Sequence, residues 1–383
     1  EPTNWFVNNF GLHDRSREEH MRRSTKYLTT TVAAGAFAFS LGVAAPVSPA
    51  EAQVVDGPKV TWRVSLWGKR RAFTESLEFI SKTVKERTGG KFNFQLYYGE
   101  QLSKSKENLD SIAVGAVDAA LVCQSYHPGK LPAANVLDMP FLPITNFDVQ
   151  YEVSKAIFDH PAVKKDFAKW NAIIFAINVL PQYEYMGKGK PPASVADFKG
   201  MRLRALGGMG RSAKKIGAVP TTVTASETYT ALQRGTVDAI GFPFTYAFSA
   251  YKLDEVAEWY TTNMSLGTVN CPIVANKNSW KKLPQQYKDL LNSLKRPAVE
   301  FQSAAYQKKD IENLKEWPKK MKAITIPEDQ MAQFRKQAGK PIWDEWVAEA
   351  SKTVPEAQEL LDLLLSTAAE ARKKHPTTRT YGK

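Results

Sequence analysis

Arg204 is the residue whose type and position most clearly indicate chemistry in this sequence. It lies near the end of the segment Gly200–Ala205, which we predict to be a β-strand. Open α/β sheets bind ligands beyond the carboxyl ends of their strands, and a guanidinium fork matches a carboxylate and stays charged away from water. Arg204 is therefore a candidate for a carboxylate site, although by position alone a lone arginine after a strand more often forms a surface ion pair. Arg202, on the same strand face, is the competing candidate, and proximity to the strand end favours Arg204.

The other predicted strand ends carry mainly aromatic side chains. The residues that follow the first and third strands, 67–70 and 124–127, are pocket candidates for the same reason as Arg204. Besides Arg204, the predicted ligand-binding residues are Phe242, Trp67, Tyr126, Gln124, Tyr183 and Tyr246. For any one of the aromatic residues, core packing is an equally good interpretation. An aromatic wall can hold a flat or cationic group by stacking or by a cation–π contact.

Sequence patterns for catalysis or metal binding are absent. There is no CxxC or HExxH, and the three histidines beyond residue 52, His127, His160 and His375, each precede a proline, which favours loop or turn positions. The glycine-rich run 207–210 lacks the Lys-Ser/Thr of a phosphate-binding loop, so we predict a plain turn before a helix. No pair of acidic residues near the strand ends has a spacing that demands acid–base catalysis. We expect no catalytic residue, no metal and no cofactor.

Cys123 and Cys271 are the only cysteines. An exported protein can contain a disulfide, but two cysteines this far apart cannot be paired from sequence alone. We favour two buried, unpaired side chains and leave the disulfide as the alternative.

The N-terminal segment is typical of an export signal. Residues 21–52 combine a basic start at Met21-Arg22-Arg23, an uncharged run over 28–45 and the triplet Ala50-Glu51-Ala52. This pattern predicts a secretory signal peptide that is cleaved after Ala52. The run is too weakly apolar to favour a transmembrane anchor, and the export route, Sec or twin-arginine, stays open. Residues 1–20 precede the expected initiator, Met21, and receive no function.

The chain is basic, with 52 Lys and Arg against 39 Asp and Glu and a net charge of +13. A basic balance suits nucleic acid, an anionic membrane or anionic small molecules. Here the basic residues are spread along predicted helices and interleaved with Glu, which is typical of a solvated surface. We therefore expect no nucleic-acid partner and, after signal cleavage, no stable membrane insertion.

The order of predicted elements indicates two α/β halves, for which 383 residues give ample length. Strands at 59–66, 92–98 and 118–123 alternate with helices at 71–88 and 103–114, which favours a parallel, doubly wound sheet. A second such set begins near Leu180. The remaining predictions are strands at 172–179, 200–205, 237–241 and 268–275, and helices at 151–170, 212–216, 226–234, 283–319 and 341–374. Two similar halves joined by more than one crossing are typical of hinge-closing binding proteins.

Seven short blocks occur in a fixed order along the chain. They are 99–102, 115–121, 137–142, 197–204, 217–220, 226–239 and 280–284. In this order the blocks resemble the extracytoplasmic solute receptors of tripartite ATP-independent periplasmic (TRAP) transporters, the family of C4-dicarboxylate receptors. The resemblance implies that the second arginine of Gly200-Met201-Arg202-Leu203-Arg204 pairs with the carboxylate of the ligand.

Two departures from the family pattern bear on the ligand. Many family members carry a second arginine where this chain reads Leu180-Pro181-Gln182-Tyr183, and many carry an asparagine at the position of Phe242. The missing arginine argues against a clamp for two carboxylates. Phe242 and the neighbouring aromatic residues instead suggest one carboxylate with a flat or cationic remainder.

The resemblance implies an α/β, periplasmic-binding-protein-like fold with two doubly wound lobes, a hinge, a ligand cleft and a helical C-terminal segment. The predicted domains are an upstream extension (1–20), the signal peptide (21–52), lobe I (53–180 plus 268–308), lobe II with the C-terminal helices (181–267 plus 309–370) and a tail (371–383). The implied function is capture of a small organic carboxylate in the periplasm and its delivery to TRAP membrane permease subunits. An exported sensor subunit and a periplasmic enzyme are the alternatives. The sequence does not decide the identity of the ligand, the oligomeric state, or whether a metal ion joins the ligand in the site.

Overall fold

The computed structural model describes residues 54–376. The predicted upstream extension, the signal peptide and most of the predicted tail lie outside the described residues.

The first sheet has five strands in the order β2-β1-β3-β10-β4. Their bounds are β1 (Val60–Ser65), β2 (Phe92–Tyr97), β3 (Ala119–Leu121), β4 (Ala172–Ala176) and β10 (Ile273–Asn276). β1 runs parallel to β2 and β3, whereas β10 runs antiparallel to both of its neighbours. The five strands were all predicted, including the late return of β10, but the sheet is mixed and not purely parallel.

Helices cover this sheet and link its strands. They are η2 (Ala72–Thr74), α1 (Glu75–Arg87), α2 (Asn108–Ala113), η3 (Gln124–Tyr126), η4 (Ala134–Asp138), α3 (Phe147–Asp159), α4 (Pro161–Ala168) and α8 (Lys277–Lys282). The single helix predicted over 151–170 is two helices, which meet at His160. The reason is Pro161, since a residue before proline avoids helical angles and proline itself suits the first position of a new helix.

The second sheet has six strands in the order β11-β9-β5-β8-β6-β7. Their bounds are β5 (Tyr183–Gly187), β6 (Arg202–Arg204), β7 (Val219–Thr221), β8 (Ala239–Pro243), β9 (Trp259–Thr261) and β11 (Lys322–Ile324). β6 runs parallel to β7 and β8, and β5 runs antiparallel to β8 and β9. The sequence predicted only β6 and β8. β7, β9 and β11 are too short to show an alternating pattern.

Further helices lie around the second sheet, except the last one, α12, which packs beside the first sheet. They are η5 (Val195–Phe198), α5 (Gly207–Lys215), η6 (Ala225–Glu227), α6 (Thr228–Gln233), α7 (Tyr246–Ala250), η7 (Leu253–Glu255), η8 (Trp317–Lys319), α10 (Glu328–Ala338), α11 (Lys340–Ala350) and α12 (Ala357–Lys374). The glycine-rich run at 207–210 is the first turn of α5, so the predicted turn is wrong. A Cβ at Gly208 would lie 2.6 Å from the carbonyl oxygen of Asp138, which shows that glycine here permits close packing of α5 on η4.

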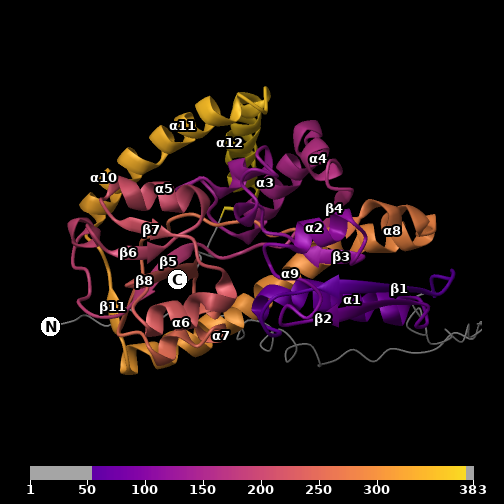
Figure 1. The fold of residues 1–383 in the computed structure, drawn as a ribbon, viewed down its shortest axis with the longest axis horizontal. Helices are drawn as coiled ribbons and strands as arrows, with labels where there is room; N and C mark the ends of the chain where they lie inside the picture. The colour runs from indigo at the N-terminus through magenta and orange to yellow at the C-terminus, as the bar shows by residue number, and fades with distance from the viewer. Residues whose placement is uncertain (1–53, 377–383) are drawn as a thin grey trace, which may run out of the picture. The chain divides into compact units, whose positions relative to one another are not determined.

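The chain passes between the two sheets several times. It crosses from β4 to β5, returns from β9 to β10, and crosses again along the long helix α9 (Gln285–Glu316). α9 packs on α1 and β4 at one end and on α7 and η8 at the other, and Figure 1 shows it running from one sheet to the other. The C-terminal helix α12 packs on α3 beside the first sheet. We use first lobe and second lobe for the parts built on the first and second sheets; the sequence boundaries of the predicted lobes remain a prediction.

Cys123 and Cys271 form a disulfide, so our preference for unpaired cysteines is wrong. β3 and β10 are antiparallel neighbours, and Cys123 lies just after β3 whereas Cys271 lies just before β10. The sheet therefore brings the two Cα atoms to 3.9 Å from each other. A pairing that depends on a strand returning from the other lobe leaves no local signal in the sequence.

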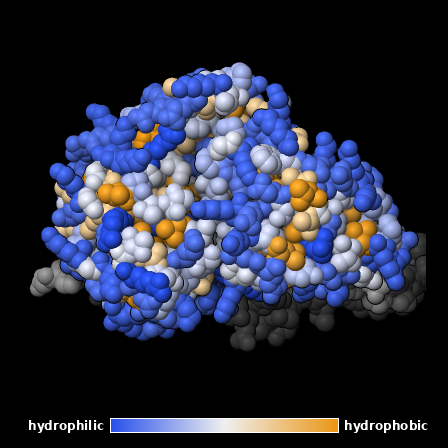
Figure 2. Space-filling model, viewed as in Figure 1, coloured by the Kyte–Doolittle hydropathy of each residue, from blue (hydrophilic) through white to orange (hydrophobic). Residues whose placement is uncertain are grey.

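One face of the molecule is mainly polar (Figure 2). The face in Figure 2 is largely hydrophilic, with apolar residues in small, separate patches. Over residues 54–376, no helix has both the length and the apolar character needed to cross a membrane.

Candidate ligand-binding site

A small cavity lies where the carboxyl ends of parallel strands from both sheets converge. β6 and β8 of the second sheet end there, and the segments after β1 and β3 of the first sheet reach it. Six of the seven predicted ligand-binding residues line the cavity, namely Trp67, Tyr126, Tyr183, Arg204, Phe242 and Tyr246. The cavity encloses about 30 Å³, which is room for about two water molecules.

Arg204 is almost fully buried, with 1% of its surface exposed. Its Nε donates to the carbonyl of Val223 at 3.0 Å, and its Nη1 donates to the carbonyl of Gly241 at 2.7 Å. Its Nη2 lies 3.5 Å from the hydroxyl of Tyr126. Among the described residues no carboxylate forms an ion pair with it. Charged side chains are almost never buried without a partner of opposite charge, so the guanidinium is available to an anion.

Phe242 forms the wall beside Arg204. The guanidinium carbon of Arg204 lies 4.6 Å from the centroid of the Phe242 ring, a cation–π contact. The Phe242 ring in turn packs against Tyr251, with centroids 5.3 Å apart. Phe242 thus provides both an apolar surface for a ligand and a fixed orientation for the arginine.

Trp67 and Tyr126 bring the first lobe to the cavity. Their ring centroids are 6.3 Å apart. The hydroxyl of Tyr126 accepts a hydrogen bond from the backbone N–H of Ala225 at 3.2 Å and lies near Arg204. Tyr126 follows β3 in the first sheet, whereas Ala225 and Arg204 belong to the second lobe. This hydroxyl therefore joins the two lobes at the cavity.

Tyr183 and Tyr246 line the cavity from the second lobe. Burial raises the pKa of both hydroxyls well above the ordinary tyrosine value. They are therefore neutral near pH 7. The hydroxyl of Tyr183 can donate to an acceptor in the cavity, whereas that of Tyr246 hydrogen-bonds Tyr306. Tyr246 also packs against Tyr306 of α9, with centroids 4.8 Å apart, so α9 supports this wall.

Gln124 is the one predicted site residue that the structure places elsewhere. Its side chain is fully buried, and its Nε2 donates to Asp138 at 3.2 Å outside the cavity. It shares the tight 3-10 turn η3 with Tyr126, and residues two apart on such a turn point to different sides. Burial holds the pKa of Asp138 well above its usual range. Gln124 therefore does not line this cavity, and its part in ligand binding stays a prediction.

Arg71 and Tyr251 are among the cavity residues that sequence reasoning missed. Arg71 is one position beyond the pocket candidates 67–70 that follow the first strand. A window longer by one residue would have included it. Tyr251 follows α7 and lies well past the end of β8, so the rule of strand ends gives no signal for it.

Arg202, the competing candidate, lies on the surface. Its Nε and backbone N–H both donate to Asp238, at 3.1 and 2.7 Å, in a largely exposed pair. The ion pair lowers the pKa of Asp238. Glu227 closes a capping box with Thr224, as expected of a capping residue. These charged groups are structural, so of the two candidate arginines Arg202 and Arg204 only Arg204 lines the cavity.

The histidines do not form a catalytic arrangement in the described part of the chain. Burial lowers the pKa of His127 to about 4, so it is neutral near pH 7. His160 caps the start of α4 and contacts Glu359. No hydrogen bond joins a serine or threonine hydroxyl to either histidine within residues 54–376. In the same range, no group of three His, Cys, Asp or Glu residues is placed to hold a metal ion.

The sequence also matches proteins of known family. The family model of the bacterial extracellular solute-binding proteins, family 7, matches residues 64–350. A monocarboxylate 2-oxoacid-binding periplasmic protein of Nostoc sp. is 26% identical over 244 residues, which cover 62% of this chain and 65% of the relative. The C4-dicarboxylate-binding periplasmic protein DctP of Rhodobacter capsulatus is 28% identical over 254 residues, which cover 65% of this chain and 72% of the relative.

The fold is also similar to solved structures. A TRAP solute-binding protein from Rhodoferax ferrireducens, solved in complex with copurified benzoate, superposes with a TM-score of 0.75 at 19% identity. The superposition covers 82% of this chain and 99% of that one. At this identity the likeness establishes the two-lobed fold and not the ligand.

Proposed function

Because the chain belongs to family 7 of the bacterial extracellular solute-binding proteins, the family of the TRAP solute receptors, we propose that it captures a small organic carboxylate between its lobes. In this proposal the exported protein delivers the ligand to the membrane permease subunits of a TRAP transporter. The named relatives support the ligand class, since one is a monocarboxylate 2-oxoacid-binding protein and another a C4-dicarboxylate-binding protein. The family is one of binding proteins that serve transport, and we propose no catalytic step.

The observation that carries the proposal is the buried charge of Arg204. Its guanidinium is 1% exposed and has carbonyl and hydroxyl partners but no carboxylate among the described residues. A carboxylate in the cavity would neutralise this charge and accept hydrogen bonds from the remaining N–H groups of Arg204. Hydrogen bonds to charged groups contribute about 1.5–3 kcal/mol each, so two such bonds from the guanidinium to one carboxylate supply a large part of the roughly 8 kcal/mol of a micromolar affinity.

The walls of the cavity suit a ligand with a compact or flat remainder. Phe242, Trp67 and Tyr126 offer apolar ring surfaces, and the neutral hydroxyl of Tyr183 offers a donor. At about 30 Å³ the cavity is far smaller than the roughly 300–1,000 Å³ that is typical of ligand pockets, so ligand entry requires its walls to move apart. We propose a hinge motion for this step, with the bound ligand favouring closure through contacts to both lobes.

A thermal-shift screen tests the proposal directly. Benzoate, pyruvate and succinate are compared with benzamide, pyruvamide and succinamide, within a wider panel of aliphatic, aromatic and zwitterionic carboxylates. We expect the melting temperature to rise progressively as the concentration of at least one acid exceeds its dissociation constant. The matching amide lacks the charge that pairs with Arg204 and should have no effect. Amides as effective as their acids, or a panel without any effective acid, would contradict the proposal.

A further inference from the structure

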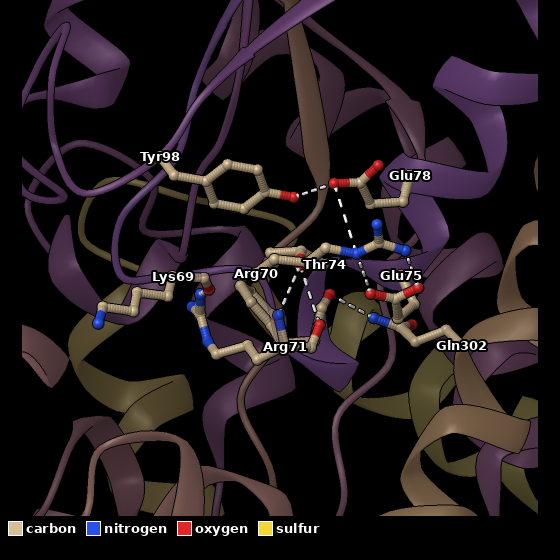
Figure 3. Close-up of polar contacts among 9 residues, drawn as sticks. Lys69, Arg70, Arg71, Thr74, Glu75, Glu78, Tyr98 and Gln302 are labelled. Atoms are coloured by element: carbon tan, nitrogen blue, oxygen red, sulfur yellow. Dashed lines mark hydrogen bonds and ion pairs between the residues drawn. The ribbon is translucent and has the colours of Figure 1, made fainter.

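Arg70 and Arg71 are neighbours in sequence with different surroundings. Arg70 forms a two-pronged ion pair with Glu75, with distances of 2.8 and 2.9 Å, and Glu78 lies 3.7 Å from it. The Nη1 of Arg71 instead donates to two backbone carbonyls, those of Trp67 and Lys69, both at 2.8 Å. Figure 3 shows the carboxylates of Glu75 and Glu78 gathered at Arg70, whereas the side chain of Arg71 points toward Lys69. No ion pair of Arg71 with a carboxylate occurs among the described residues.

The guanidinium of Arg71 is held between two aromatic rings. Its central carbon lies 4.8 Å from the ring centroid of Phe73 and 5.4 Å from that of Tyr251. Its Nε is buried and has no hydrogen-bond partner among the described residues. Gly68 permits this position, because a Cβ there would lie 2.9 Å from the Tyr251 hydroxyl and 3.0 Å from Nη1 of Arg71, and its φ is +65°. Arg71 is thus a fixed cation with an unused, buried donor.

Arg71 and Arg204 line the same cavity from different lobes. Arg71 follows β1 of the first sheet, and Arg204 ends β6 of the second. Two aromatic rings separate the two guanidinium groups, since Arg204 stacks on Phe242, Phe242 packs on Tyr251, and Tyr251 packs on Arg71. The cavity therefore has a cation at each end of an aromatic wall and no carboxylate among the residues that line it.

We propose that Arg71 binds a second anionic group of the ligand, opposite the carboxylate that Arg204 holds. The inference rests on the proposed function and specifies its ligand as a dianion with a flat spacer between its charged ends. A planar spacer lies along the edges of the Phe242 and Tyr251 rings, whose faces are covered by the two guanidinium groups and by each other. The second anionic group accepts the hydrogen bond of the buried Nε. The sequence argued against a clamp for two carboxylates because it lacks an arginine at 180–183; Arg71 supplies that second cation from the other lobe.

Matched acids and matched variants test this inference by calorimetry. Phthalate, isophthalate and terephthalate are compared with benzoate, and succinate and glutarate with butyrate. For the unchanged protein we expect at least one diacid to bind tenfold or more tightly than its monoacid. In Arg71→Gln the binding of that diacid weakens by about tenfold or more, whereas that of the monoacid changes by less than about threefold. Arg71→Lys, which keeps the charge but not the fork, should restore part of the loss.

Arg70→Gln is the control, because it removes the neighbouring arginine that is already paired with Glu75. It should leave the affinities for both diacid and monoacid unchanged. Monoacids that bind as tightly as the diacids, or an equal loss for both in Arg71→Gln, would overturn the role of Arg71 while leaving the proposed function intact. Failure of every acid to bind the unchanged protein would instead overturn the proposed function.

Discussion

At the scale of single residues, the central feature is a buried guanidinium that the protein itself does not neutralise. Arg204 is 1% exposed, and its partners within the described residues are neutral oxygens. An uncompensated buried charge lowers stability, and such a group persists when function requires it. We expect the ligand-free protein to be less stable because of this charge, and its free energy of unfolding to increase when an anion binds.

Tyr126 gives a prediction at this scale. Its hydroxyl accepts from Ala225 and lies near Arg204, so it connects the lobes at the cavity. Tyr126→Phe removes these contacts but keeps the ring. Because an uncharged hydrogen bond contributes about 0.5–1.5 kcal/mol, we expect affinity for an effective acid to fall about two- to tenfold, as measured by calorimetry.

Tyr97→Phe serves as the control for this change. The hydroxyl of Tyr97 bonds Gln95 on the exposed face of β2, away from the cavity. The Tyr97→Phe substitution should leave the affinity for the acid unchanged. An equal loss in both variants would show that Tyr126 acts through general stability and not through the cavity.

Much of the site could be predicted because its residues follow strand ends. Arg204, Phe242 and Trp67 all lie there, where the topology of an α/β sheet places ligands. Gln124 and Arg71 show the limit of the rule. Both are close to a strand end, yet the side on which each lies depends on local turns, the 3-10 turn η3 for Gln124 and the Gly68 turn for Arg71. Such turns depend on packing that the strand pattern does not contain.

At the scale of elements, the contact between α9 and the segment after β8 contains a titrating group. Asp310 of α9 accepts hydrogen bonds from the backbone N–H and the hydroxyl of Thr245, at 3.1 and 2.8 Å. Burial raises the pKa of Asp310 from 3.8 to about 6. The folded protein therefore keeps this proton between about pH 4 and 6, whereas the unfolded chain releases it.

The sign of the resulting pH dependence follows from this difference. Because the folded state binds the proton more tightly, the contribution of Asp310 to the free energy of unfolding is largest at low pH and is lost as the pH rises through about 6. The full shift corresponds to about 2–3 kcal/mol, and partial exposure reduces this value. The carboxylate therefore destabilises the fold near pH 7.

Asp310→Asn tests the effect, since its amide oxygen can still accept from Thr245 without a charge. We expect the melting temperature of the variant, relative to that of the unchanged protein, to be a few degrees higher at pH 7.5 than at pH 4.5. The measurement is a pair of calorimetric scans for each protein at the two pH values. If the melting temperatures of the variant and the unchanged protein differ by the same amount at both pH values, this result would contradict the raised pKa of Asp310.

The elements that sequence predicted are those long enough to show a period. β1, β2 and α9 have clear alternating or helical patterns and were found, whereas β7, β9 and β11 have three residues each and were not. The disulfide was missed because Cys271 meets Cys123 only after β10 returns from the second lobe. Pairings between distant segments are properties of the topology and cannot be read from local periodicity.

At the scale of the whole molecule, the two lobes meet around a cavity of about 30 Å³, and each lobe contributes a cation and aromatic rings to it. α9 and the crossings between the sheets connect the lobes. A ligand that contacts Arg204 in one lobe and Trp67 or Tyr126 in the other would favour the closed arrangement. Binding and closure are then a single event, in which the cavity forms around the ligand.

The most direct test of this account is a calorimetric titration of the most effective acid into three proteins: the unchanged chain, Arg204→Gln and Arg202→Gln. Loss of a buried charged partner costs about 2–5 kcal/mol, so Arg204→Gln should weaken binding at least about thirtyfold. Arg202→Gln, which removes an exposed arginine two residues earlier on the same strand, should bind like the unchanged protein. Undiminished binding by a folded Arg204→Gln protein would contradict the claim that this cavity holds the carboxylate.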